Sequence, residues 1–246
     1  MSRFRSSIPF RFVACVAAAF LLSFFTACGG PSNSSPQEKP TPAPASELEL
    51  SGVYNVEGAG ENEKEPYKGV LTLTNQEDVY KFEWQTNRSR HTGVGVQMGD
   101  AVAATYALAG NGKGCGVALY RIASDGSLDG SIADWGKYTY GSEKAERIEG
   151  TTFEGKYKVT GTTNEGKPYD GSLAVKKNGG GYQFTWNTGG RESFGFGIWR
   201  GDRAAISFGG HHCYFAIYKV QSGRTLEGHW GSQRNTAFGT ETARRQ

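Results

Sequence analysis

The sequence predicts an all-β protein built of two tandem small antiparallel β-barrels, each with about eight short strands. Two observations carry this prediction. A stretch of almost a hundred residues, 51–148, recurs as 154–245, which indicates an internal duplication. Within each copy, apolar and polar residues alternate with the period of two that is typical of half-buried strands. After residue 50 no segment has a sustained helical pattern.

The first 27 residues have the order of a secretory signal peptide. Residues 1–12 contain three arginines and no acidic residue, and residues 13–25 are almost all apolar. This apolar run is shorter than the ~20 residues that a membrane-spanning helix needs. The segment therefore favours a cleaved signal over a transmembrane helix.

The end of this segment resembles the lipobox of bacterial lipoproteins. Phe25-Thr-Ala-Cys28 fits it at the last three positions, whereas Phe25 stands where leucine is usual. The resemblance implies that Cys28 is lipidated and becomes the first mature residue. Because Gly29 rather than aspartate follows it, the resemblance also implies that the protein is anchored to the outer membrane. Whether it faces the periplasm or the cell exterior is left open. Several acyl chains would anchor the protein stably to a membrane.

Residues 28–50 are predicted to be the lipidated cysteine and a linker. Residues 29–46 contain five prolines among small and polar residues, without apolar periodicity. Such a segment cannot bury enough surface to fold, and its prolines keep it extended. We expect the folded part to be presented away from the membrane.

The two copies, which we bound at 51–148 and 151–246, share their motifs in one order. The matched motifs are Gly52-Val-Tyr54 with Gly155-Lys-Tyr157, Pro66-Tyr67 with Pro168-Tyr169, Tyr80-Lys-Phe82-Glu-Trp84 with Tyr182-Gln-Phe184-Thr-Trp186, Gly93-Val-Gly95 with Gly195-Phe-Gly197, and Cys115, Tyr120, Leu128 and Gly130 with Cys213, Tyr218, Leu226 and Gly228. Both copies then finish with Trp-Gly and Gly-x-Glu-x-Ala. So many matches in one order indicate a duplication.

Eight segments of the second copy have strand character, and short turns separate them. They lie near 154–160, 169–176, 181–187, 193–199, 203–208, 213–220, 225–230 and 237–243. Turn pairs such as Gly99-Asp100 and Gly201-Asp202 suit antiparallel hairpins. Sequential strands with short turns favour an up-and-down barrel over a sandwich. The opening Gly-x-Tyr faintly resembles the Gly-x-Trp of lipocalin-like and avidin-like barrels.

Charge and cysteine content narrow the class of protein. Without Arg3, Arg5 and Arg11 the chain has 24 basic and 24 acidic side chains, which gives no support to nucleic-acid binding. Cys15 leaves with the signal. Cys115 and Cys213 either pair as a disulfide in an oxidising compartment or stay as two buried thiols.

No pattern in the sequence points to catalysis, a metal or a cofactor. Histidines occur at 91, 211, 212 and 229, but neighbouring His211 and His212 point to opposite faces of a strand, and the first copy has no counterpart of this pair. No nucleophile elbow or phosphate-binding loop occurs. We therefore expect a protein that is not an enzyme, without metal or cofactor.

The aromatic residues supply the candidate binding surface. The repeated Tyr-x-Phe-x-Trp strands are expected to fill the barrel interiors. Trp135 and Trp230 follow the seventh strand of each copy, at a less regular rim. With Tyr138 and Tyr140 they are the first choice for an exposed contact patch.

The repeat as a whole resembles one found in bacterial exported proteins, some of them labelled fibronectin-binding. The resemblance covers residues 51–245 and implies adhesion or protein contact without identifying the residues. The leading hypothesis is a membrane-anchored, non-catalytic binding protein that contacts a protein or envelope polymer through barrel loops. The alternatives are a carrier of a small apolar ligand inside a barrel and an inhibitor of a periplasmic hydrolase.

Overall fold

The computed structural model describes residues 48–60, 63, 65–108 and 112–246. Sixteen strands and one short 3₁₀ helix make up this part of the chain. The strands are β1 (Gly52–Ala59), β2 (Tyr67–Gln76), β3 (Val79–Thr86), β4 (Arg90–Met98), β5 (Ala101–Ala107), β6 (Gly116–Ile122), β7 (Leu128–Asp134), β8 (Gly141–Glu149), β9 (Gly155–Thr162), β10 (Pro168–Asn178), β11 (Gly181–Thr188), β12 (Arg191–Arg200), β13 (Arg203–Phe208), β14 (Cys213–Val220), β15 (Leu226–Ser232) and β16 (Asn235–Arg245), with the 3₁₀ helix at Ser222–Arg224.

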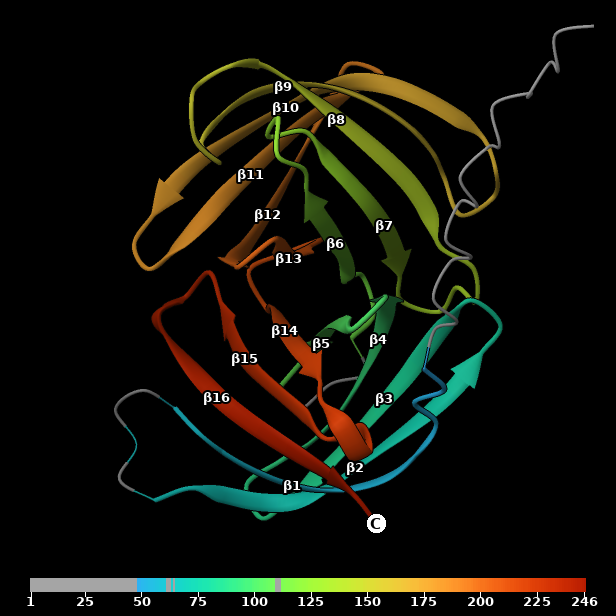
Figure 1. Cartoon of the computed structure of the whole chain (residues 1–246), viewed down its shortest axis with the longest axis vertical. Helices are drawn as coiled ribbons and strands as arrows, with labels where there is room; N and C mark the ends of the chain where they lie inside the picture. Colours follow the sequence, from blue (N-terminus) through green and yellow to red (C-terminus); the bar gives the residue numbers. More distant parts are fainter. Residues whose placement is uncertain (1–47, 61–62, 64, 109–111) are drawn as a thin grey trace, which may run out of the picture. The chain divides into compact units, whose positions relative to one another are not determined.

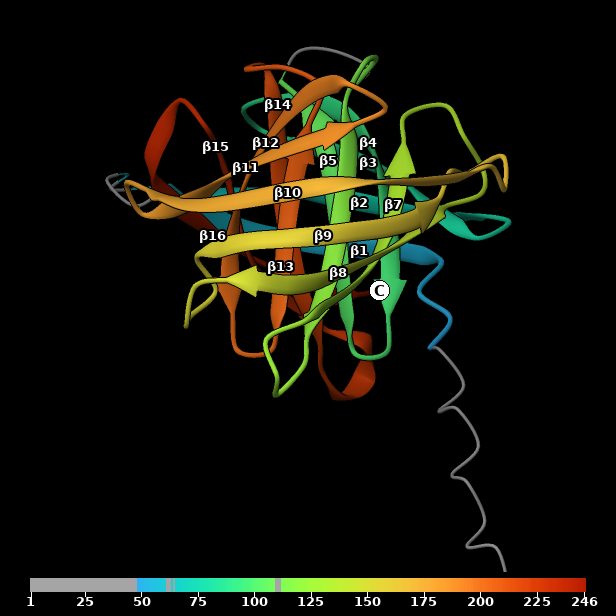
Figure 2. The ribbon, with the colours of Figure 1, turned by 90° about the horizontal axis from the view of Figure 1, so that it is seen from above.

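The strands close into two antiparallel barrels of eight strands each, as the sequence predicts. The first barrel contains β1–β5 and β14–β16, and the second contains β6–β13. In Figure 1 the blue and teal strands β1–β3 share a barrel with the red strands β15 and β16. Figure 2 looks onto β8, β9 and β10 of the second barrel, which lie side by side in that order. The predicted all-β fold class is confirmed.

Each barrel contains strands from both sequence repeats, a point that the sequence left open. β5 pairs with β14 rather than with β6, so that Ala104 lies opposite Ala216. Likewise β13 pairs with β6, and Ile206 lies opposite Ala118. The second barrel is thus one continuous segment inserted between β5 and β14. The copies 51–148 and 151–246 each give five strands to one barrel and three to the other.

The strands at this exchange are buried on both faces. Every residue of β5 is buried, and β6, β13 and β14 are nearly so. One face of each strand lines its own barrel, while the other packs against the neighbouring barrel. Thirteen buried residues form this shared core: Val79, Val94, Val96, Ala101, Ala103, Val117, Leu119, Ala133, Phe196, Ile198, Ala205, Phe215 and Ile217. Hydrophobic burial on both faces explains why these strands do not alternate.

One end of each barrel is closed by a large apolar side chain. Tyr54 donates its hydroxyl hydrogen to the carbonyl oxygen of Leu50 over 2.7 Å, and Leu50 is completely buried. Tyr157 does the same to the carbonyl oxygen of Phe153 over 2.8 Å. Leu50, the last residue of the predicted linker, therefore belongs to the core of the first barrel.

The aromatic strands fill the barrel interiors, as expected for a packed core. Phe82 and Phe184 are completely buried. Trp84 and Trp186 lie two residues further along β3 and β11, on the same face of each strand. The predicted signal peptide, Cys28 and most of the linker lie outside the described residues. Within the described part of the chain, no helix is both long and apolar enough to cross a bilayer.

Candidate functional site

A buried carboxylate lies inside the first barrel and accepts three hydrogen bonds. Tyr67 on β2 donates to Oε2 of Glu241 over 2.7 Å. Trp84 on β3 and Tyr218 on β14 donate to Oε1 over 3.1 and 2.7 Å. Glu241 itself comes from β16 and is 5% exposed. Four strands, two from each repeat, therefore position this cluster.

The second barrel contains the same cluster at the equivalent positions of the repeat. Tyr120 donates to Oε1 of Glu143 over 2.5 Å, and Trp186 donates to the same oxygen over 3.1 Å. Tyr169 donates to Oε2 over 2.9 Å. Tyr120 and Glu143 come from the first copy, whereas Tyr169 and Trp186 come from the second. The exchange of strands therefore completes both clusters.

The local sequence directs each glutamate inward. In Gly-x-Glu-x-Ala the glutamate shares one face of the strand with a fully buried alanine, Ala243 or Ala145. Glycines make room for its partners. A Cβ on Gly58 would lie 2.3 Å from the hydroxyl oxygen of Tyr67, and one on Gly228 would lie 2.4 Å from the ring of Tyr218. The tyrosines reach the carboxylate only because these neighbours lack side chains.

Burial governs the electrostatics of both clusters. It raises the pKa of Glu241 and of Glu143 above the ordinary value, while the three donors to each carboxylate pull the pKa back down. Burial and the neighbouring carboxylate raise the pKa values of Tyr67 and Tyr120, so these phenols remain hydrogen-bond donors. In the described part of the chain neither glutamate forms an ion pair.

A cavity of about 380 Å³ opens beside Glu241 at the end of the first barrel opposite Leu50. Seven aromatic side chains line it: Tyr67, Trp84, His91, Tyr106, Tyr214, Tyr218 and Trp230. The ring centroids of Trp84 and His91 are 5.0 Å apart, those of His91 and Tyr106 are 4.5 Å apart, and those of Tyr106 and Tyr214 are 5.4 Å apart. This volume lies within the usual range of small-molecule sites.

Two polar groups of the cavity wall are unusual. Burial lowers the pKa of His91 from 6.5 to about 4, so its imidazole is neutral at pH 7. The Nε1 of Trp230 is buried and faces the hydroxyl oxygen of Tyr67 without reaching the geometry of a full hydrogen bond. A buried N–H without a well-placed acceptor is costly, and a ligand in the cavity could supply one.

At the rim of the cavity a cation and an anion of the chain neutralise one another. Arg88 in the β3–β4 turn pairs with Glu63. It also lies over the ring of Tyr67, with its Cζ 5.9 Å from the centroid. Both residues line the cavity. The rim pair leaves the buried Glu241 as the one uncompensated acidic group among the described lining residues.

The corresponding end of the second barrel is smaller and poorer in aromatic residues. Its cavity measures about 260 Å³. Strand register identifies the equivalent positions of the two mouths. The second barrel has Ser193 in place of His91, Phe208 in place of Tyr106, Gly116 in place of Tyr214 and Ile132 in place of Trp230. The two barrels thus share the carboxylate cluster and differ at the mouth.

The four aromatic residues predicted as a contact patch are not brought together. Trp230 lines the first-barrel cavity. Trp135 packs against the core between the barrels. Tyr138 and Tyr140, which are 54% and 41% exposed, lie in the β7–β8 loop of the second barrel. The sequence motif Trp-Gly matches Trp135 with Trp230, but strand register makes Ile132 the second-barrel equivalent of Trp230.

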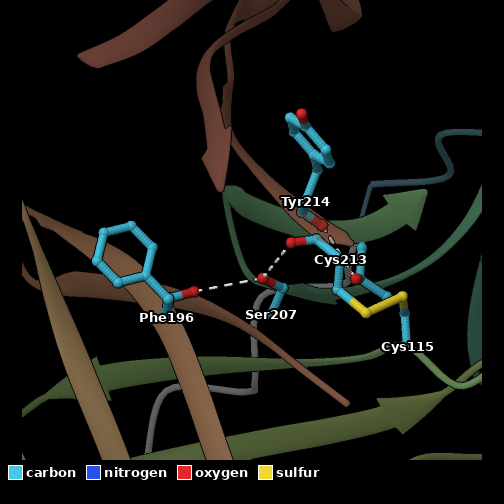
Figure 3. The surroundings of a disulfide bond; sticks show 6 residues. Cys115, Phe196, Ser207, Cys213 and Tyr214 are labelled. Carbon is cyan, nitrogen blue, oxygen red and sulfur yellow. Dashed lines mark hydrogen bonds between the residues drawn. A yellow bond between two sulfur atoms is a disulfide. The ribbon is translucent and has the colours of Figure 1, made fainter. Parts of the chain in front are cut away.

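Cys115 and Cys213 form a disulfide in the structure (Figure 3). Cys115 precedes β6 and Cys213 begins β14, so the bond joins the two segments where the chain crosses between barrels. Ser207 donates to the carbonyl oxygens of Phe196 and Cys213 beside it. His212 lies close to both sulfur atoms. Because the sulfurs are bonded to each other, this trio offers no thiolate to a metal.

The sequence patterns did not single out Glu143 or Glu241 as functional candidates. A signal was present, because each glutamate occupies an inward position of an alternating strand and recurs in both copies. An acid on the apolar face of a strand is rare unless it has partners. Comparisons with protein-family models, with curated proteins and with solved structures found no match.

Proposed function

We propose that this chain is an exported, lipid-anchored, non-catalytic binding protein whose first barrel takes up a small ligand. One observation carries the proposal: a cavity at an open barrel end combines seven aromatic side chains with a buried acceptor, Glu241, and a buried N–H donor, Nε1 of Trp230, that lacks a well-placed acceptor. Ligand sites are typically concave and mostly apolar, with a few fixed polar groups. Among the alternatives from the sequence, the geometry favours a carrier.

The proposal includes no reaction. The tyrosines and the tryptophan that surround Glu241 all donate to it, which holds the carboxylate in place. His91, the one histidine among the described lining residues, stacks between Trp84 and Tyr106. Ser89 lies beside His91 in the lining, with its Oγ 3.3 Å from Nδ1. Burial lowers the pKa of this imidazole to about 4, so it is a weak base for activating a hydroxyl at pH 7. Such an arrangement suits binding.

Native mass spectrometry of the mature chain, purified from a host that exports it, tests ligand uptake. We expect a bound small molecule, or uptake of one from a compound library, at one copy per chain. Trp230→Ile, which installs the residue of the second barrel, should abolish uptake. Trp199→Ile, at a surface position, should retain it. A chain that takes up no compound in either form contradicts the proposal.

Anchoring rests on Cys28 and is tested separately. We expect the full chain to sediment with membranes and Cys28→Ser to appear in the soluble fraction. Protease treatment of intact cells then distinguishes a surface-exposed protein from a periplasmic one. A full chain that stays soluble argues against lipidation.

A second candidate function is contact with a protein or envelope polymer. A groove of about 640 Å³ runs along β11, β12 and β13, and Phe194 on its wall is 54% exposed. Gln233 of the first barrel donates to Gln183 of the second beside it, over 3.0 Å. Exposed apolar surface of this kind is typical of contact sites. Binding to a panel of matrix proteins, envelope polymers and secreted hydrolases, lost in Phe194→Ser, would support this function.

A further inference from the structure

We propose that the first-barrel cavity selects a small organic ammonium ion, with the protonated nitrogen placed at Glu241 and the carbon body against the aromatic walls. This inference rests on the proposed function and names its ligand class. It follows from three features of the cavity: its net charge, the direction of its hydrogen bonds and its walls.

The charge of the cavity favours a cation. Its described lining contains Glu241, the rim pair of Glu63 with Arg88, and the neutral His91. Arg88 and Glu63 cancel, so an ionised Glu241 leaves the cavity with one negative charge. A buried charge without a counterion is costly. A positively charged ligand removes this cost, whereas an anion adds to it.

The hydrogen bonds at the floor leave acceptors free and donors used. Tyr67 and Tyr218 give their only hydroxyl hydrogens to Glu241, as Trp84 gives its only indole hydrogen. Glu241 accepts three bonds and has room for a fourth, and both phenol oxygens keep their lone pairs. An ammonium group supplies N–H donors and has no lone pair, so it complements the groups around Glu241. The Nε1 of Trp230, on the wall, is a donor that the ammonium nitrogen leaves unsatisfied.

The walls fit a carbon body of limited size. Stacked aromatic rings bury apolar surface and attract a nearby cation. The chain itself gives an example, because the Arg88 guanidinium lies over the Tyr67 ring at the rim. A volume of about 380 Å³ is at the low end for ligand pockets. We therefore expect a compact amine rather than a polymer or a lipid.

Two sets of probes with matched bodies test the charge. One set is 2-phenylethylammonium, 2-phenylethanol and 3-phenylpropionate, and the other is butylammonium, butan-1-ol and pentanoate. Affinities are measured by calorimetry on the mature chain. In at least one set we expect the ammonium ion to bind ten times more tightly than the alcohol or better, and the anion to bind least.

Paired variants locate the effect. Glu241→Gln should reduce the ratio of ammonium to alcohol affinity to near one, while Glu143→Gln, the same change in the second barrel, should leave the ratio unchanged. Thermal unfolding checks that both variants fold, and the wild-type ratio stands by itself if Glu241→Gln does not fold.

The outcomes separate the two proposals. If an alcohol or an anion binds as tightly as its ammonium partner, or if only a neutral or acidic library compound enters the cavity, the ammonium class is wrong and the small-ligand function stands. If no probe and no library compound binds, both proposals fail.

Discussion

The two barrels are built on one plan and differ at their open ends. Each has a glutamate that accepts bonds from two tyrosines and a tryptophan, and each is closed at the far end by an apolar residue, Leu50 or Phe153. Only the first barrel adds a histidine, two tyrosines and a tryptophan at the mouth. The comparison indicates that both barrels share the carboxylate cluster and that the mouth determines whether the body of a ligand fits beside it.

The largest effect should be equal in the two barrels. Phe82→Ala and Phe184→Ala each remove a completely buried ring from the interior. We expect each to lower the free energy of unfolding by about 3 to 5 kcal/mol, because large-to-small core changes leave a cavity. Urea denaturation measures both. A loss of stability in only one of the two variants would show that the two barrel interiors are not equivalent.

Removing the disulfide should weaken the link between the barrels. The two cysteines are 98 residues apart in sequence, so the bond closes a long loop that includes the whole second barrel. The double variant Cys115→Ala with Cys213→Ala should lower the free energy of unfolding by about 2 to 5 kcal/mol. Denaturation with and without reductant measures this loss, and the oxidised wild type serves as the control. Equal stability of the two forms would show that packing alone joins the barrels.

A pH-dependent difference should distinguish the mouths. The pKa of His91 is about 4 in the folded chain and 6.5 in the unfolded chain. As pH falls below 6.5, His91 is protonated in the unfolded chain but stays neutral in the folded chain. The free energy of unfolding therefore decreases between pH 6.5 and 4. The loss reaches about 3 kcal/mol.

His91→Ser, which installs the residue of the second barrel, should make stability less dependent on pH in this range. Unfolding measured at several pH values tests it. The variant has to be compared with the wild type because Glu143 and Glu241 change the stability in the opposite direction over the acidic range. Their raised pKa values make both glutamates stabilise the fold at low pH and lose that contribution as pH rises past 4.5. An unchanged slope in His91→Ser would mean that the imidazole is solvated.

The smallest stability effect should again be shared. Tyr218→Phe and Tyr120→Phe each remove one hydrogen bond to a buried carboxylate while keeping the ring. A loss of about 1.5 to 3 kcal/mol is expected for a bond to a charged group. Thermal unfolding compares the pair. If only Tyr218→Phe destabilised the chain, the cluster of the second barrel would not be its structural equivalent.

The sequence predicts much of this fold because its strands alternate and its copies repeat. Eight segments proposed for the second copy correspond to β9–β16 with shifts of a few residues at their ends. The exchange of strands between copies was not predictable from alternation, since β5 could pair with β6 or with β14 at similar local cost. The runs Ala101–Ala107 and Arg203–Phe208, without alternation, signal burial on both faces, and this burial is where the barrels meet.

The candidate site was predictable only in part. Trp230 was among the aromatic residues expected at a rim, and it lines the cavity. Trp135, Tyr138 and Tyr140 lie elsewhere, because sequence neighbours in a barrel diverge once register places them on different faces or loops. Glu241 and its partners are spread over residues 67–241, and only strand pairing brings them together.

We propose that the first barrel binds a ligand and that the second barrel does not. The most direct measurement is the set of indole N–H signals of the five tryptophans by NMR, assigned with single Trp→Phe variants, during titration with 2-phenylethylammonium. We predict that the signals of Trp84 and Trp230 move together and saturate at one ligand per chain, while that of Trp186 stays in place. Movement of Trp186 alone, or equal movement of Trp84 and Trp186, would contradict it.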